Sequence, residues 1–193
     1  MSADLVVGDD ALARCAWAAA SADYRDYHDG EWGVPIRDDR ALYERLCLES
    51  FQSGLSWITI LRKRSGFRAA FADFDPEVVA EFGPAQIEVL LADASIVRHR
   101  GKIQATITNA RAVLALWESE GQGSLTTLLS TAAPRPSAVP QTLAEIPAST
   151  PESAALARDL KRRGFTFLGP TTLYAALQAT GFVNDHLVGC HRR

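Results

Sequence analysis

The fold is decided by the stretch Arg163-Gly164-Phe165-Thr166-Phe167-Leu168-Gly169-Pro170-Thr171-Thr172. It joins two segments that are predicted to be helical, Glu152 to Arg163 and Thr171 to Thr180. Two glycines followed by small hydroxyl residues allow a tight turn whose backbone N–H groups point outward. Such a turn before a helix N-terminus binds phosphate through amide hydrogen bonds and the helix dipole. The sequence therefore predicts backbone contacts to a phosphate at Gly164, Gly169, Thr171 and Thr172.

This layout is that of the helix-hairpin-helix DNA-binding motif. As a bare pattern it is weak, because most helix connections bounded by glycines are only turns. A plain turn between two helices therefore stays open as the alternative at this point.

Outward from this stretch, the chain is almost wholly helical by pattern. Apolar residues recur at spacings of three and four from Asp38 to Leu61, where Gly54 interrupts the pattern. Further helices are predicted from Asp75-Pro76 to Gly83-Pro84, over 86–92 and over 101–118. The proline-rich part from Gly121 to Pro151 is predicted to be an irregular connection. The only strand candidate is Phe165 to Leu168.

Length and composition fit one globular unit. The chain has 193 residues, of which 47% are hydrophobic and 22% charged. We expect an all-α fold with a single domain over 1–193. Within this range, residues 1–13 are expected to form a flexible tail. No apolar run reaches the roughly 20 residues of a membrane helix. Because the start of the chain is acidic and lacks a secretory pattern, we expect a cytoplasmic protein with no membrane partner.

Net charge and cysteine content argue against a disulfide-rich protein and give no support to any class of binding partner. The formal net charge of −3 gives no electrostatic support to a nucleic-acid partner. Three cysteines far apart in the sequence argue against a disulfide framework.

Four residues near the two ends of the chain form a candidate metal site. Cys15 and His28 lie near the start, and His186 and Cys190 lie near the end with three residues between them. Two thiolates and two imidazoles complete a closed tetrahedral zinc shell of the structural kind. Such an ion would tie the terminal segments together. The competing reading is that these residues never meet, and the other possible ligands are Cys47, His99 and His191.

Aromatic residues and one carboxylate suggest a pocket. Tyr24 and Tyr27 lie close together in sequence, Trp17 is just upstream, and Glu49 precedes Trp57 by eight residues. Glu49 and Trp57 would share one helix face if the helix is unbroken. Aromatic faces stack on a base and attract a cation, and a carboxylate accepts hydrogen bonds from an exocyclic amino group. The alternative is a surface glutamate beside an aromatic core.

These residues together resemble a known family. The matching motifs run in order along most of the chain and are Cys15-Ala16-Trp17, Tyr27-His28-Asp29-Gly30-Glu31-Trp32-Gly33-Val34-Pro35, Leu48-Glu49, Gly54-Leu55-Ser56-Trp57-Ile58-Thr59, Arg98-His99-Arg100-Gly101-Lys102-Ile103, Arg163-Gly164-Phe165 and Asn184-Asp185-His186-Leu187-Val188-Gly189-Cys190. The family is the constitutive bacterial 3-methyladenine DNA glycosylase I family. The run from Tyr27 to Pro35 and the closing His-x3-Cys are highly specific in combination.

The resemblance implies a helix-hairpin-helix glycosylase fold, and it implies one structural Zn²⁺ bound by Cys15, His28, His186 and Cys190. It also implies a base pocket at Glu49, Tyr27, Trp57, Tyr24 and Trp17, with Glu49 as the catalytic group. The implied activity is hydrolysis of the N-glycosidic bond of 3-methyladenine in double-stranded alkylated DNA by a monomer.

Several positions depart from the family pattern or tempt other readings. About eleven residues precede the Cys15 position, Phe51 replaces an expected glutamine, and Ser95 replaces an expected glycine. Asp185 lies near the place where most helix-hairpin-helix glycosylases carry a catalytic aspartate, but the resemblance assigns it no role. Lys102 lies outside the hairpin where lyase lysines occur, so we expect a monofunctional enzyme.

Three other functions are compatible with parts of the pattern. A non-catalytic DNA-binding module would keep the hairpin and the zinc but have a spoiled pocket. A zinc hydrolase would need an open coordination position, which a closed Cys2His2 set lacks. A related glycosylase would act on another damaged base, such as 3-methylguanine.

Overall fold

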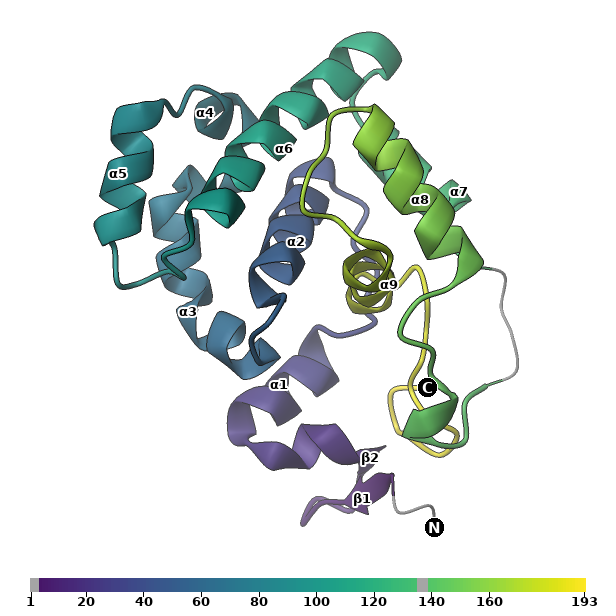
Figure 1. The fold of residues 1–193 in the computed structure, drawn as a ribbon. Helices are drawn as coiled ribbons and strands as arrows, with labels where there is room; N and C mark the ends of the chain where they lie inside the picture. The colour runs from purple at the N-terminus through teal and green to yellow at the C-terminus, as the bar shows by residue number, and fades with distance from the viewer. Residues whose placement is uncertain (1–3, 135–138) are drawn as a thin grey trace.

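The computed structural model describes residues 4–134 and 139–193 (Figure 1). The α-helices in these residues are α1 Ala22–Gly30, α2 Asp39–Gln52, α3 Trp57–Ala70, α4 Pro76–Ala80, α5 Pro84–Ala92, α6 Arg100–Glu120, α7 Ser124–Thr131, α8 Pro151–Arg162 and α9 Pro170–Ala179. Short 3-10 helices cover Ala16–Ala20, Ala72–Phe74 and Leu143–Glu145. Two strands, β1 Leu5–Val7 and β2 Ala13–Cys15, pair antiparallel. The prediction of a mostly helical protein is confirmed.

Local sequence sets where several helices begin. The Asp38 side chain accepts a 2.8 Å hydrogen bond from the Ala41 amide and caps α2. Thr150 and Ser153 bond reciprocally in a capping box at the start of α8. Helices α4, α5, α8 and α9 carry proline in the first turn, where no amide hydrogen is needed.

Helix α2 is the centre of the molecule. It packs against α3, α6, α7 and α9, and Figure 1 shows α9 beside it and α3 to α6 on its other side. Its buried side chains include Leu42, Tyr43, Leu46 and Phe51, each at most 1% exposed. Because α2 is buried on several faces, a charged side chain on it can reach the interior as well as the surface.

The structure differs from the predicted secondary structure in four places. The pattern from Asp38 to Leu61 is two helices, separated by a turn in which Gly54 has a φ of +81°. The connection from Gly121 to Pro151 contains α7 and a 3-10 turn, so it is less irregular than predicted. Phe165 to Leu168 is not a strand, and α1 was not predicted from its polar sequence.

The segment that is predicted to be a flexible tail, 1–13, contains secondary structure among its described residues. Strand β1 lies within that segment, and its Leu5 pairs with Cys15 of β2. The C-terminal segment runs beside this hairpin, where the His191 amide donates a 2.8 Å bond to the Ala13 carbonyl (Figure 1). The two ends of the chain therefore lie together. No helix within 4–134 or 139–193 is long and apolar enough to cross a bilayer.

Candidate functional site

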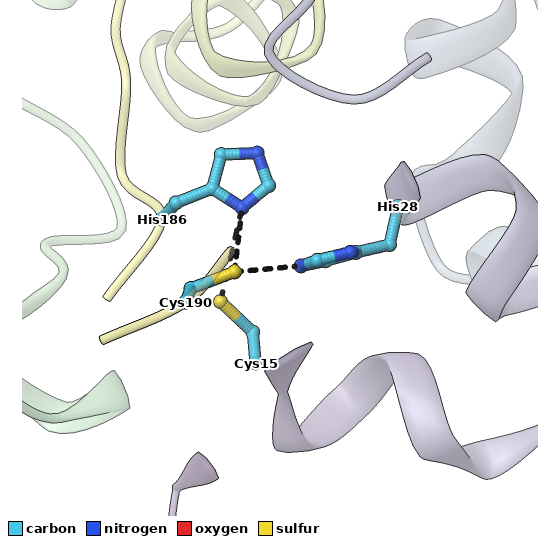
Figure 2. Close-up of side chains that lie close together, drawn as sticks. All are labelled: Cys15, His28, His186 and Cys190. Atoms are coloured by element: carbon cyan, nitrogen blue, oxygen red, sulfur yellow. Dashed lines mark hydrogen bonds between the residues drawn. The ribbon is translucent and has the colours of Figure 1, made fainter. Parts of the chain in front are cut away.

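Cys15, His28, His186 and Cys190 meet where the ends of the chain converge (Figure 2). Cys15 ends β2, His28 lies in the last turn of α1, and the other two residues follow α9. All four side chains are buried, and their ligand atoms lie within 4.8 Å of one another. Cys190 Sγ is 3.4 Å from His28 Nε2 and 3.5 Å from His186 Nδ1. The sequence prediction that these residues come together is confirmed.

The geometry of this group fits a tetrahedral metal ion. Metal–ligand bonds of 2.0–2.3 Å separate neighbouring ligand atoms by roughly 3.3–3.8 Å, close to the spacing of the four side chains here. The far nitrogen of each imidazole is held by an outer partner, because His28 Nδ1 lies 2.7 Å from Asp29 Oδ1 and His186 Nε2 lies 3.2 Å from the Trp32 carbonyl. Each ring therefore turns its other nitrogen toward the sulfur atoms, as metal-binding histidines do.

The electrostatics favour a thiolate within the group. The Cys15 thiol, His186 and His28 all point at Cys190 Sγ, and these contacts hold the pKa of Cys190 well below its ordinary value. A thiolate is the form that binds a metal. The group can therefore hold a soft or borderline divalent cation.

The competing ligands lie elsewhere. Cys47 is buried in the core, where desolvation raises the pKa of its thiol to about 12. His99 accepts from the Lys102 amide at the start of α6. His191 lies between Asp29 and the Ala13 carbonyl, outside the group.

A cavity of about 260 Å³ lies next to this centre. Its wall comes from α1, α2, α3, α9 and the turns around α1, and its lining residues are Trp17, Tyr24, Tyr27, Trp32, Glu49, Gln52, Trp57, Ala175 and Gln178. All five predicted pocket residues are therefore brought together. The volume is near the lower end of the range for small-ligand pockets.

The ring packing leaves flat faces and one carboxylate around the cavity. The Tyr27 and Trp57 rings have centroids 5.3 Å apart at 45°. The Trp17 ring meets Tyr24 edge-on at 5.9 Å. The Tyr24 hydroxyl accepts a 3.1 Å bond from the Ile58 amide and so fixes α1 against the start of α3. The cavity is thus shaped for a planar aromatic guest.

Glu49 and Trp57 share this cavity for a different reason from the predicted one. The helix breaks between them after Gln52, so they do not share one helix face. Instead, α3 folds back beside α2, and its first residue, Trp57, returns to the level of Glu49. The tertiary turn, rather than the helical repeat, brings them together.

Glu49 is a buried carboxylate without a local donor. It is 5% exposed, and no residue in the described ranges donates a hydrogen bond to its side chain. Burial raises its pKa to about 7, although the positive charge of Arg45 lowers it. The indole Nε1 of Trp57 is also buried without a partner among the described residues. An acceptor and a donor are therefore left for a guest.

Sequence reasoning missed two groups of the site. Gln178 and Ala175 reach the cavity from α9, a helix that the sequence tied only to the hairpin. Gln178 also donates a 2.7 Å bond from Nε2 to Asp185 Oδ2. The second missed group is Arg45, which is buried behind the cavity wall. In the sequence it cannot be distinguished from an exposed arginine on a helix.

The hairpin between α8 and α9 is exposed and carries free amides. Gly164 has a φ of +92°, and Thr166 is fixed by two hydrogen bonds to the Asn109 side chain. Within the part of the chain that the structure describes, no group accepts from the backbone amides of Gly169, Thr171 and Thr172. These amides lie at the first turn of α9. The turn can therefore accept an anion.

The other residues singled out from sequence have structural contacts. Lys102 donates to the Phe51 and Ser53 carbonyls at 2.9 and 2.6 Å and so closes the C-terminal end of α2. Asp185 accepts from the Tyr174 hydroxyl at 2.6 Å as well as from Gln178. Phe51 packs on Phe67 at 4.6 Å in the core and does not line the cavity.

Ser95, the other departure, lies outside the cavity too. Its amide donates a 2.7 Å bond to Asp93 Oδ1, and its carbonyl oxygen approaches Gly66 closely enough that a Cβ there would lie 2.6 Å away. None of these positions alters the metal group or the carboxylate.

The fold and the two sites define a class: a small helical protein with a closed Cys2His2 group beside an aromatic cavity that carries one buried carboxylate. A family model described as methyladenine glycosylase matches residues 17–193, and the chain belongs to this family.

Named relatives agree with that membership. DNA-3-methyladenine glycosylase 1 of Escherichia coli (strain K12) is 49% identical over 180 residues, covering 93% of this chain and 96% of that protein. The crystal structure of a 3-methyladenine DNA glycosylase I superposes with a TM-score of 0.87 at 49% identity, covering 92% of this chain and 98% of the other. A Staphylococcus aureus 3-methyladenine DNA glycosylase I, solved to describe recognition of 3-methyladenine, has a TM-score of 0.86 at 34% identity, covering 92% and 95%.

Proposed function

We propose that this chain is a monofunctional DNA glycosylase that hydrolyses the N-glycosidic bond of 3-methyladenine in alkylated DNA and leaves an abasic site. The observation that carries the proposal is the cavity in which Glu49 faces Tyr27 and Trp57. Its family membership and its similarity to named 3-methyladenine glycosylases support the same substrate.

The cavity suits a flipped, methylated adenine. Trp57 and Tyr27 offer the faces on which a base stacks, and Tyr24 and Trp17 close the wall. The Glu49 carboxylate accepts from the exocyclic amino group and attracts a positively charged ring. Because no described residue satisfies this carboxylate, the bound base gives it a hydrogen bond that the free protein lacks.

The chemical step needs little acid catalysis. Methylation at N3 makes the purine cationic, so the base leaves with the electron pair of the glycosidic bond and becomes neutral. Water then supplies the oxygen that bonds to C1′ and releases a proton. Normal adenine stacks equally well but is a poor leaving group, so selectivity comes mainly from charge and leaving ability.

We assign a structural Zn²⁺ to Cys15, His28, His186 and Cys190. The closed set of four ligands, their spacing and the outer partners of both imidazoles support this assignment. When bound, zinc links the two ends of the chain and takes no part in the chemistry.

We further infer that α8, the hairpin and α9 form a helix-hairpin-helix element that holds double-stranded DNA. The free amides of Gly169, Thr171 and Thr172, together with the turn at Gly164, support a contact to the phosphate backbone. We also propose that the chain forms one domain and acts in the cytoplasm. It would act as a monomer, since excision requires only one pocket and one flipped base.

Release of the base tests the proposal. Methylated double-stranded DNA is incubated with the protein, and the freed bases are separated by chromatography. We expect 3-methyladenine to be released by the wild-type chain and not by Glu49→Gln. Binding of DNA without release would indicate a non-catalytic module, and release of 3-methylguanine instead would indicate a different lesion.

A further inference from the structure

Arg45 is a buried charge that the proposed mechanism does not use. It lies on α2 one turn before Glu49 and is 6% exposed. Its guanidinium carbon is 5.4 Å from the centre of the Tyr27 ring and 5.3 Å from that of Trp57. Arg45 does not line the cavity, so it lies behind the two rings that do. A buried cation is costly unless other groups compensate its charge.

Polar contacts hold Arg45 in this position. Its Nη1 donates a 3.0 Å hydrogen bond to the Tyr27 hydroxyl, and its Nη2 lies 3.8 Å from Glu31 Oε2. Glu31 is in turn bound by both terminal nitrogens of Arg64, one of them at 2.8 Å. Arg64 on α3 thus shares the single charge of Glu31 with Arg45.

Glu49 adds a second carboxylate to this cluster of buried and half-buried charges. Arg45 and Arg64 carry two positive charges, and Glu31 supplies one negative charge. Glu49 supplies the second negative charge from the same face of α2 as Arg45, four residues on. The Arg45 charge offsets part of the cost of burying an ionised Glu49. Arg45 and Glu49 therefore act as partners across the pocket wall without touching.

We propose that Arg45 is a positioning residue of the base pocket, which holds Glu49 as a carboxylate and fixes the Tyr27 ring through its hydroxyl. This inference rests on the proposed function, since it assigns Arg45 a role in recognising the base. The 3.0 Å hydrogen bond from Arg45 to the Tyr27 hydroxyl holds the ring on whose face the base would stack.

Other charged groups surround Tyr27, which lines the cavity together with Glu49. Tyr27 and Glu31 belong to the end of α1, Arg64 belongs to α3, and α9 presents the uncharged Gln178, with Asp185 behind it. Burial raises the pKa of Glu49 to about 7 and Arg45 lowers it. Loss of the Arg45 charge is therefore expected to raise that pKa further, and loss of the Glu31 charge to lower it.

The pH dependence of single-turnover 3-methyladenine release tests the inference. In Arg45→Met, we expect the acid limb of the profile to move up by about one pH unit, so that the rate at pH 7, close to the wild-type midpoint, falls about 5-fold. Arg45→Lys keeps the charge, so its limb should stay near that of the wild type. Arg62→Met is the matched control, since that guanidinium is 62% exposed on α3. A uniform loss of rate with an unmoved limb would overturn the proposal.

Glu31→Gln provides a variant with the opposite expected sign. The acid limb of its pH profile should move to lower pH, which a general loss of structure would not produce. This variant therefore tests the role of Arg45 even if Arg45→Met fails to fold. The carbon NMR titration of the Glu49 carboxyl, assigned with Glu49→Gln, reads the same pKa changes without catalysis. If the wild-type chain releases no base while the variants still shift the pKa of Glu49, the proposed function alone is refuted. Unshifted titrations in an active enzyme would refute the role of Arg45 alone.

Discussion

Nδ1 of His28 lies 2.7 Å from Oδ1 of Asp29, which leaves Nε2 of the same ring facing Cys190 Sγ at 3.4 Å. Asp29 is itself held by Arg14, whose Nε and Nη2 donate to its carboxylate at 2.7 to 3.0 Å. Arg14 also bonds Asp10, which precedes β2. The orientation of one imidazole of the Cys2His2 group therefore depends on a chain of contacts that reaches the N-terminal hairpin.

Removal of this outer contact should weaken metal binding without removing a ligand. Asp29→Ala leaves the His28 ring free to rotate, and loss of such an outer partner typically costs about 10–100-fold in metal affinity. Zinc transfer to a chromogenic chelator measures the change. Asp26→Ala is the control, because that carboxylate is 77% exposed. Equal zinc affinity in the Asp29→Ala and Asp26→Ala variants would contradict the role of Asp29.

Glu49→Gln should stabilise the fold in a pH-dependent way. The folded-state pKa of Glu49 is about 7, above its ordinary value of 4.5. Folded protein keeps this proton after the unfolded chain has lost it, so the linked stability is present below pH 4.5 and is lost as pH rises through 7. The glutamine avoids that loss, which is worth up to about 3 kcal/mol.

Thermal unfolding of both proteins at pH 5 and pH 8 checks this expectation. The melting temperature of Glu49→Gln should exceed that of the wild type much more at pH 8 than at pH 5. The same difference at both values would mean that Glu49 titrates normally. Base release by this variant should be lost at both values.

Trp57→Ala should weaken binding of the free base. Stacking of a base on an aromatic side chain contributes about 1–3 kcal/mol, so Kd for 3-methyladenine should rise about 10–100-fold. Calorimetric titration gives this Kd, and circular dichroism verifies that the helices persist. Unchanged affinity in the folded variant would remove Trp57 from the pocket assignment.

Thr172→Glu should separate DNA binding from base binding. The added negative charge lies at the free amides of the α9 start and would repel a phosphate there. We expect weaker binding to DNA that carries an abasic site analogue, with unchanged affinity for free 3-methyladenine. Gln141→Glu adds the same charge at an exposed position, beside Pro140 and Leu143, which bond Val188 and Asp4 at the joined ends of the chain. Equal DNA affinity in both variants would argue against the hairpin contact.

Sequence was most informative where chemistry depends on residue type. The four Cys and His residues of the candidate metal group and the five residues of the candidate pocket were identified by their side chains and motifs, and the structure brings each set together. The route was partly wrong for Glu49 and Trp57, because periodicity describes one helix and cannot foresee the turn that folds α3 back along α2.

What sequence could not supply depends on contacts between distant segments. Arg45 lies next to Glu44, whose side chain pairs with Arg68 near the surface, and nothing local distinguishes the buried arginine from an exposed one. Its burial is set by α1 and α3. Helix α1 was missed because its sequence is mostly polar, and it is stabilised by the Ser21 cap and by packing. Gln178 reaches the cavity only because α9 packs on α2.

The Cys15 and His186 ligand atoms belong to residues 171 positions apart. An ion held by both would close almost the whole polypeptide into a ring. A growing chain on the ribosome offers only Cys15 and His28 until His186 and then Cys190 have emerged, so capture of the ion by all four residues has to follow synthesis of every helix in the described ranges. Metal loading would then mark chains that have finished folding, and a prematurely terminated product could not retain the ion.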